Sequence, residues 1–101
     1  MGIKPASAQI KKQWDKAINA EPIIMHDEKI RLETKPLDRG NNPRRTHQLK
    51  GPLATRKVGG VTYDQWQHEI TSTGRIWYCP DKRNRIIWIT LISFTHPKES
   101  E

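Results

Sequence analysis

Four residues in the last third of the chain carry the side chains that proton-transfer chemistry requires. Glu69 and Arg75 stand on either side of a turn signal at residues 72–74, and His96 and Lys98 follow near the end of the sequence. A carboxylate can accept a proton, and an imidazole, with a reference pKa of about 6.5, can donate one. The two cations can stabilise a negative charge that develops between them. These four residues are the candidate catalytic set.

Three consecutive strands are predicted to position Glu69 and Arg75. They cover residues 61–71, 74–79 and 85–94, and the last is an almost continuous apolar run. Such a run suits a strand that is covered on both faces, which favours a central place in the sheet.

The alternation of side chains along these strands assigns each residue to a face. The side chains expected against the helices are Trp66, His68, Ile70, Ile76 and Tyr78, and those expected on the open face are Gln67, Glu69, Arg75, Trp77 and Cys79. Glu69 and Arg75 are therefore expected to be cross-strand neighbours. The same pattern is also typical of an ordinary surface pair. His68, beside apolar neighbours, is interpreted as a packed, hydrogen-bonded histidine.

Two helices are predicted before the sheet. Residues 5–20 carry one apolar stripe, made of Ile10, Trp14, Ala17 and Ile18. Pro22 ends this helix or opens a second one over residues 22–34. The four residues MGIK before the first helix are too few to predict a strand.

A polar loop, residues 35–47, and a bent or edge strand, residues 47–58, are expected to link the helices to the sheet. Gly51-Pro52 interrupts that strand, because proline cannot donate to a central ladder. The order of elements predicts an α+β fold, with an N-terminal helical hairpin packed on a three- to four-stranded antiparallel sheet. We expect a single domain, 1–101, with helices at about 5–34, the sheet at about 48–95 and a short tail at 96–101.

The charge of the chain points to an anionic partner. The formal net charge is +7, and residues 40–85 hold nine Lys and Arg against three Asp and Glu. The residues expected to bind nucleic acid are Lys50, Arg44, Arg45, Arg56, Lys57 and Trp77, with Lys82, Arg83 and Arg85 extending the basic region. Trp77 can either stack a base or pack against the sheet.

Other classes of protein find little support in the sequence. The single cysteine, Cys79, excludes an internal disulfide and fits a reducing compartment. No apolar run approaches the roughly 20 residues that span a bilayer, so we expect a cytoplasmic protein with no membrane partner. No glycine-rich phosphate loop and no metal-ligand spacing is found, so no metal and no small-molecule cofactor is expected.

With this order of elements the chain resembles the RelE/ParE superfamily of type II toxins, the small basic toxins of bacterial toxin–antitoxin pairs. The resemblance covers residues 6–99 and is carried by Leu49-Lys50-Gly51, by the hairpin EITSTGRIWY and by the tail His96-Pro97-Lys98-Glu99. Many members carry lysines on the second strand and a strand before the first helix. At the positions of those lysines on the second strand, this chain has Gln67 and Glu69.

The resemblance implies a ribosome-associated endoribonuclease that inhibits translation and is neutralised by a cognate antitoxin protein. In that branch of the family the 2′-hydroxyl of the mRNA itself is the nucleophile. Arg75 matches the family's phosphate-contacting arginine, and His96 or Lys98 falls where the family places its C-terminal catalytic residue. Glu69 would then act as base and His96 as acid, while Arg75, Lys98 and Lys50 hold the phosphate.

Two further hypotheses stay open. The ParE branch of the same superfamily acts on gyrase and implies DNA damage in place of mRNA cleavage. A non-catalytic basic module would bind nucleic acid or a protein through the same charges, with His96 and Lys98 as ordinary solvated residues of the tail. A binder should tolerate Glu69→Gln and His96→Gln, whereas a nuclease should not.

Overall fold

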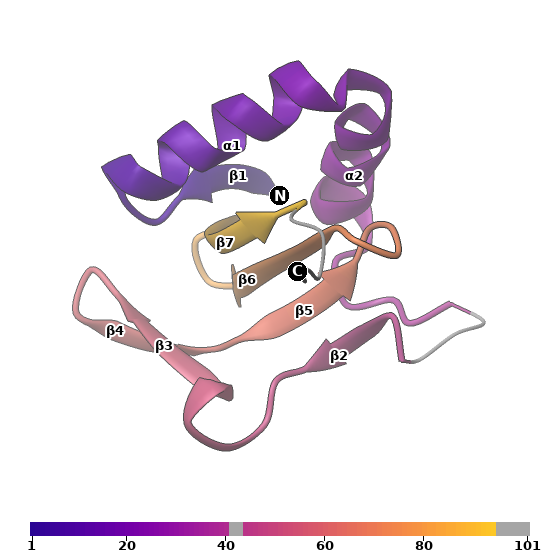
Figure 1. The fold of residues 1–101 in the computed structure, drawn as a ribbon. Coiled ribbons are helices and arrows are strands. Elements are labelled where there is room, and N and C mark those ends of the chain that lie inside the picture. Colours follow the sequence, from indigo (N-terminus) through magenta and orange to yellow (C-terminus); the bar gives the residue numbers. More distant parts are fainter. Residues whose placement is uncertain (41–43, 95–101) are drawn as a thin grey trace.

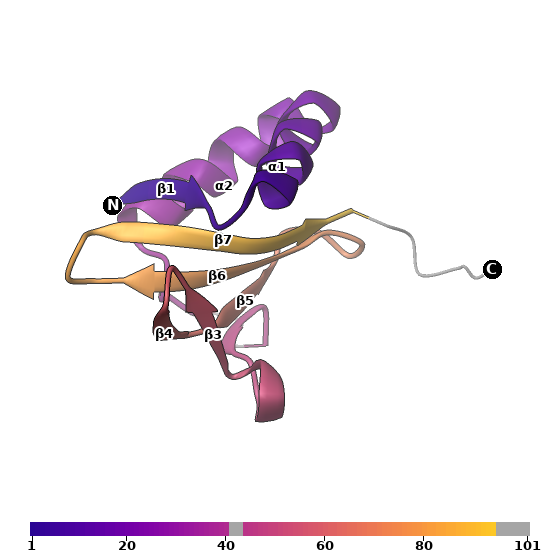
Figure 2. The same cartoon turned by 90° about the vertical axis from the view of Figure 1, so that its left-hand side faces the viewer.

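Two helices lie on one face of a β-sheet, and a separate β-hairpin lies on the other side of that sheet (Figure 1, Figure 2). The computed structural model describes residues 1–40 and 44–94. The predicted α+β class, with an N-terminal pair of helices packed on a sheet, is confirmed. Neither of the two helices among the described residues has the length and the apolar composition of a membrane span.

The helices follow from capping and from the apolar stripe. Helix α1 spans Ala8–Ala20, and its first turn is capped by the hydroxyl of Ser7, which accepts from the backbone N–H of Ile10 at 3.2 Å. Ile10, Trp14 and Ala17 are buried, as the stripe predicts. Helix α2 spans Pro22–Thr34 and has proline in its first turn, where the missing N–H is not needed.

The main sheet has five strands in the order β1-β7-β6-β5-β2. Strand β1 (Gly2–Pro5) runs parallel to β7 (Ile86–Ser93), so the prediction that no strand precedes the first helix is wrong. The expected count of three to four antiparallel strands is wrong for the same reason. β7 pairs with β1 on one side and with β6 (Arg75–Asp81) on the other, which explains its apolar run.

The region between the helices and β5 (Trp66–Glu69) is broken into shorter pieces than predicted. The expected bent strand at 47–58 becomes β2 (Thr46–Gln48) in the main sheet, a 3₁₀ turn (Gly51–Leu53) and β3 (Thr55–Val58). β3 pairs only with β4 (Val61–Asp64), in a two-stranded hairpin. Gly59 and Gly60 turn this hairpin with φ of 59° and 81°, values that favour glycine.

Gln65 separates β4 from β5, where one continuous strand was predicted over residues 61–71. Its buried side chain donates to the carbonyl of Leu53 at 2.9 Å and accepts from the hydroxyl of Thr90 at 2.6 Å. Thr90 is the extra residue in the register between β6 and β7, because Tyr78 pairs with Ile89 and Trp77 with Leu91. Buried hydrogen bonds that join three segments outweigh the alternation of the sequence here.

β6 also extends past its predicted end. The strand predicted over residues 74–79 continues to Asp81, and Pro80 is paired with Ile87 inside it. β5 covers β6 only from Arg75 to Tyr78, so Pro80 lies where one edge of the strand has no partner in the sheet. Proline is tolerated at such an edge because no ladder hydrogen bond is lost.

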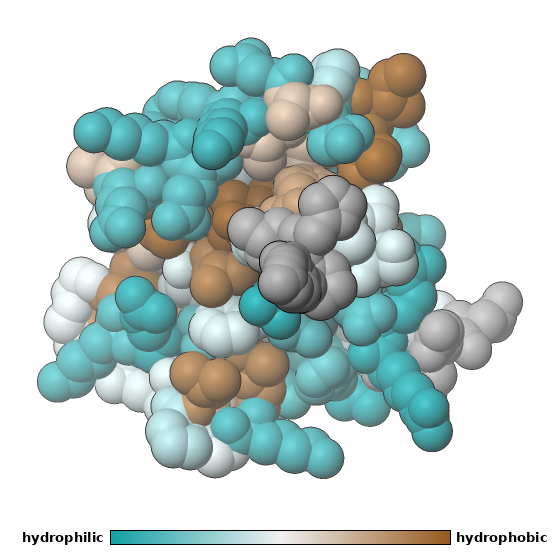
Figure 3. Space-filling view, in the orientation of Figure 1, coloured by the Kyte–Doolittle hydropathy of each residue, from teal (hydrophilic) through white to brown (hydrophobic). Residues whose placement is uncertain are grey.

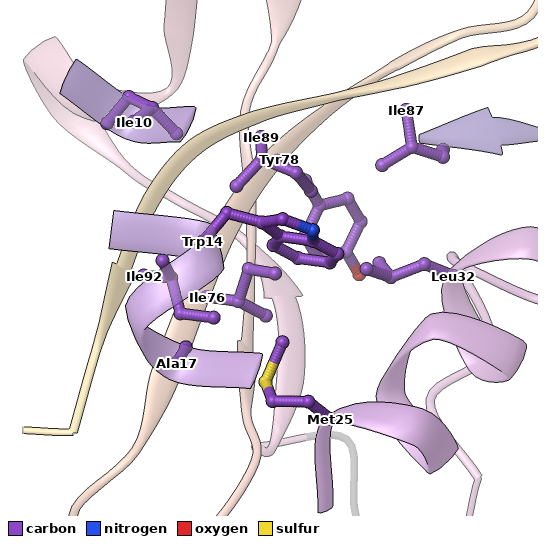
Figure 4. Close-up of a cluster of buried hydrophobic side chains, with 10 residues drawn as sticks. All are labelled: Ile10, Trp14, Ala17, Met25, Leu32, Ile76, Tyr78, Ile87, Ile89 and Ile92. Carbon is purple, nitrogen blue, oxygen red and sulfur yellow. The ribbon is translucent and has the colours of Figure 1, made fainter. Parts of the chain in front are cut away.

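The hydrophobic core fills the space between the two helices and the sheet (Figure 4). Its members are Ile10, Trp14, Ala17, Met25, Leu32, Ile76, Tyr78, Ile87, Ile89 and Ile92. On the face seen in Figure 3, hydrophilic residues cover most of the surface, and hydrophobic residues show between the helix layer and the sheet. The other face of β6 carries Arg75, Trp77 and Cys79, and the β3–β4 hairpin lies on that side of the sheet (Figure 2).

Candidate nucleic-acid interface

Glu69 and Arg75 are direct cross-strand partners at the end of the β5–β6 hairpin. Both side chains are exposed, as predicted from the alternation. With Gln67 and the turn residues 71–74 they line a depression of about 190 Å³. Within residues 1–40 and 44–94, the two charges form no ion pair with each other, so both remain available to a ligand.

The turn that joins these two strands is tightly packed. Ile70 donates its backbone N–H to the carbonyl of Gly74 at 2.9 Å. The ring of Phe94 lies against Gly74 so closely that a Cβ there would stand 2.4 Å from the ring. Contact with the end of β7 thus fixes the turn, and with it the spacing of Glu69 and Arg75.

Trp77 lies on the same face, but its indole N–H is already engaged. It donates to the side-chain oxygen of Gln67 on the neighbouring strand at 2.7 Å, and both residues are half-buried. Cys79, also expected on this face, is fully buried, and burial raises the pKa of its thiol to about 11. The β3–β4 hairpin lies beside β6 (Figure 2), with β4 in contact with β6, whereas Glu69 and Arg75 line their depression where β6 begins.

Asp81 anchors the hairpin to the sheet. Its carboxylate accepts hydrogen bonds from the hydroxyl of Tyr63 at 3.0 Å, from Asn84 at 2.9 Å and from the indole of Trp88 at 3.4 Å. These hydrogen bonds, above all that from the Asn84 side chain, lower the pKa of Asp81. No pattern in the sequence connects Tyr63 of the hairpin with Asp81, the last residue of β6 in the main sheet.

The residues predicted to bind nucleic acid fall into three groups. Arg44 and Lys50 lie together, with Arg39 and His47, around a depression of about 500 Å³ whose described lining contains no acidic residue. Arg56 and Lys57 are exposed on the separate hairpin. Arg45 is turned toward the β5–β6 turn, where its guanidinium donates to the carbonyls of Glu69 and Ile70 at 2.8 and 3.0 Å.

His96 and Lys98, the remaining members of the candidate catalytic set, lie outside the described residues. The geometry therefore concerns only the Glu69–Arg75 half of that set. Ser93, the cross-strand partner of Arg75 on β7, precedes His96 by three residues in the sequence.

A buried polar network on the helix side of the sheet was missed by the sequence analysis. Glu28 of α2 is 4% exposed and pairs with Arg31 at 2.8 Å. The imidazole of His68 stands between Glu28, 3.5 Å from its Nε2, and the hydroxyl of Thr46, 2.6 Å from its Nδ1. Arg31 also lies over the ring of Tyr78. The one available signal was the spacing of Glu28 between Met25 and Leu32, which places a carboxylate on the buried stripe of α2.

This network shifts the pKa values of its members. Burial, together with the nearby charges of Arg31 and Arg45, lowers the pKa of His68 to about 4, so the imidazole is neutral at pH 7. Burial raises the pKa of Glu28, against the opposing effect of Arg31. The interpretation of His68 as a packed, hydrogen-bonded histidine agrees with this geometry.

The fold and the site define an α+β protein with an open, charged end of its sheet. Comparisons with protein-family models, with curated proteins and with solved structures give no significant match to this chain.

Proposed function

We propose that this protein is the toxin of a type II toxin–antitoxin pair, a RelE-like endoribonuclease that cleaves mRNA on the ribosome and so inhibits translation. The observation that carries the proposal is the cross-strand pair of Glu69 and Arg75, which stands exposed beside an open depression. The order of elements adds support. A strand precedes the helical hairpin, as in many members of the RelE/ParE superfamily, and in this chain it pairs with the last strand.

The reaction assigns a role to each charged group. Glu69 accepts the proton of the RNA 2′-hydroxyl, and the resulting oxygen attacks phosphorus while the bond to the 5′-oxygen breaks. Arg75 holds the phosphate oxygens, for which a guanidinium is well shaped. His96 donates the proton that the departing 5′-oxygen needs, and Lys98 adds positive charge. No metal or other cofactor takes part in this scheme.

The basic residues around the β2 edge supply affinity for the RNA backbone. Arg44 and Lys50 share one depression, and Arg56 and Lys57 extend the positive surface onto the hairpin. A cognate antitoxin with an acidic or amphipathic segment would compete for these charges. Because mRNA, the ribosome and the antitoxin are cytoplasmic, the proposal implies that the protein acts in the cytoplasm.

Induced expression in a bacterial host tests this function. We expect growth arrest, with new mRNA 5′ ends inside translated messages, and loss of both in Arg75→Ala. The control is Lys12→Ala, which removes one exposed positive charge on α1, remote in sequence from the hairpin, and should leave arrest and cleavage intact. Arrest with DNA damage and intact messages would refute the nuclease and indicate a gyrase-directed toxin.

A non-catalytic nucleic-acid-binding module is the second candidate. The depression lined by Arg39, Arg44, His47 and Lys50 favours it, because these residues can bind phosphates without any proton-transfer group. In that case Glu69→Gln and His96→Gln should both leave RNA binding and any growth effect unchanged.

A further inference from the structure

A further pocket opens on the helix side of the sheet, where the end of α2 meets β2 and β5. Its volume is about 310 Å³, at the lower end of the range for small-ligand sites. Four cationic side chains line it, namely Arg31, Lys35, Arg39 and Arg45, together with Asp38, Thr46 and His68. His68 and Glu69 are consecutive on β5 and point to opposite faces, so this pocket and the Glu69–Arg75 depression are separate.

The carboxylates near this pocket are already engaged. Glu28, beneath the pocket, binds Arg31 through both of its oxygens, and Asp38 accepts from the backbone N–H of Gly40 at 2.7 Å. Four cations thus face two carboxylates, which leaves an excess of two positive charges. In the described part of the chain, Lys35 forms no side-chain hydrogen bond and no ion pair, so its charge is directed at solvent.

The cations are also held in defined positions. Arg45 is fixed by its hydrogen bonds to the carbonyls of Glu69 and Ile70. Arg39 lies over the ring of Trp66 at 5.6 Å from its centroid. A guanidinium that is already ordered loses less entropy when an anion binds.

His68 and Thr46 form one wall of the pocket without adding charge. The imidazole is neutral at pH 7, since burial and the charges of Arg31 and Arg45 hold its pKa near 4. Glu28 from α2 and Tyr78 from β6 are the other titratable groups of this network. An anion in the pocket would offset the two arginine charges and raise the pKa of His68. The histidine is thus a natural reporter of occupancy.

We propose that this pocket binds a phosphate monoester, the dianionic group whose charge matches the excess of two cations. Arg39 and Arg45 present planar donors suited to phosphate oxygens, and Lys35 adds a point charge. The group can belong to a free nucleotide or to the 5′ end of an RNA, and inorganic phosphate shares its chemistry. This site goes beyond the proposed nuclease activity and needs no cleavage to be observed.

NMR of the histidine ring resonances tests the site directly. The probes are inorganic phosphate, adenosine 5′-monophosphate and adenosine, each at constant ionic strength set with KCl. We expect both phosphates to shift the His68 resonances at pH 7 and to raise its pKa, and adenosine to do neither. No response of His68 to phosphate, or an equal response to adenosine, would overturn the proposal.

Paired variants locate the binding groups. Lys35→Gln combined with Arg39→Gln should weaken phosphate binding about tenfold or more. Lys12→Gln combined with Lys29→Gln removes two exposed charges from the helices and should leave binding unchanged. Equal weakening in both pairs would show only general electrostatic attraction and would refute the site.

One further measurement distinguishes an RNA 5′ end from a free nucleotide as the source of the phosphate. A second distinguishes the phosphate site from the proposed nuclease site. Tighter binding of a 5′-phosphorylated oligoribonucleotide than of its 5′-hydroxyl form assigns the site to RNA ends, and tighter binding of adenosine monophosphate assigns it to nucleotides. Arg75→Ala should leave the response of the His68 resonances to phosphate unchanged, because Arg75 does not line this pocket. If the protein proves not to be a nuclease, the phosphate site can still be confirmed by this experiment. If the phosphate site is refuted, the nuclease proposal is not affected.

Discussion

The imidazole Nδ1 of His68 lies 2.6 Å from the hydroxyl of Thr46, its Cα partner on the neighbouring strand β2. This hydrogen bond joins the short edge strand to the buried network under α2. Since the same ring faces Glu28, protonation of His68 would change both contacts. The pair therefore couples the pH of the solution to the packing of the sheet on the helices.

Acid should destabilise the protein through His68. Between pH 6.5 and about 4 the unfolded chain binds a proton at this residue and the folded protein does not, so stability falls as the pH drops. The depressed pKa corresponds to about 3 kcal/mol over that range. Urea unfolding of the wild type and of His68→Gln at several pH values should show a flatter profile in the variant.

Two details sharpen that experiment. Glu28 acts in the opposite sense, because its raised pKa means that stability is lost as the pH rises above 4.5. The difference between wild type and variant isolates the contribution of His68. His26→Gln, at an exposed position of α2, is the control, and equal pH slopes in all three proteins would contradict the prediction.

Gly74→Ala should destabilise the β5–β6 turn. The added Cβ would stand 2.4 Å from the ring of Phe94 and 2.9 Å from the hydroxyl oxygen of Thr71, so the ring must move. Overpacking of this kind costs about 1–3 kcal/mol in the free energy of unfolding. A thermal double-mutant cycle with Phe94→Ala measures the coupling, and additive effects of the two changes would argue against the contact.

Asp81→Asn should loosen the β3–β4 hairpin without unfolding the main sheet. The amide keeps the shape of the side chain but weakens the hydrogen bonds from Tyr63, Asn84 and Trp88. Hydrogen exchange should become faster at residues 55–64, while the amides of β7 stay protected. Asp64→Asn, exposed on the hairpin itself, should leave the exchange unchanged.

Glu69→Gln should lower the rate of mRNA cleavage by about 10²–10⁴-fold if the carboxylate is the base. The amide has nearly the same size and cannot accept the proton, so RNA affinity should be preserved. Cleavage in a purified translation system and RNA binding by titration give the two readouts. Glu33→Gln, an exposed position of α2, provides the matched control. A full cleavage rate in Glu69→Gln would exclude this residue as base.

Much of the fold was predictable because local patterns and tertiary packing agree. The stripe through Ile10, Trp14 and Ala17 predicted the buried side of α1, and alternation predicted the register of Glu69 with Arg75. β1 was not predictable, since four residues carry little pattern and their parallel partner lies more than eighty positions away. Pairing of that kind depends on the whole fold.

The candidate site was predictable only where one hairpin contains it. Arg45 was assigned to nucleic acid by its charge alone, although its guanidinium faces backbone carbonyls from another strand. Glu28 was overlooked because the burial of a carboxylate depends on Arg31 and on His68, which comes from a different element. Sequence periodicity describes one element at a time and does not show such pairings.

The parallel pairing of β1 with β7 has a consequence for synthesis of the protein. Ile3 pairs with Ile87, so the partner of β1 is translated 84 residues after it. At about 5–20 residues per second, β1 waits roughly 4–17 s for that partner. Helices α1 and α2 can form during this time, but the sheet cannot close on them. If the protein is the proposed ribosome-associated toxin, it would become active only after its own ribosome has translated β7.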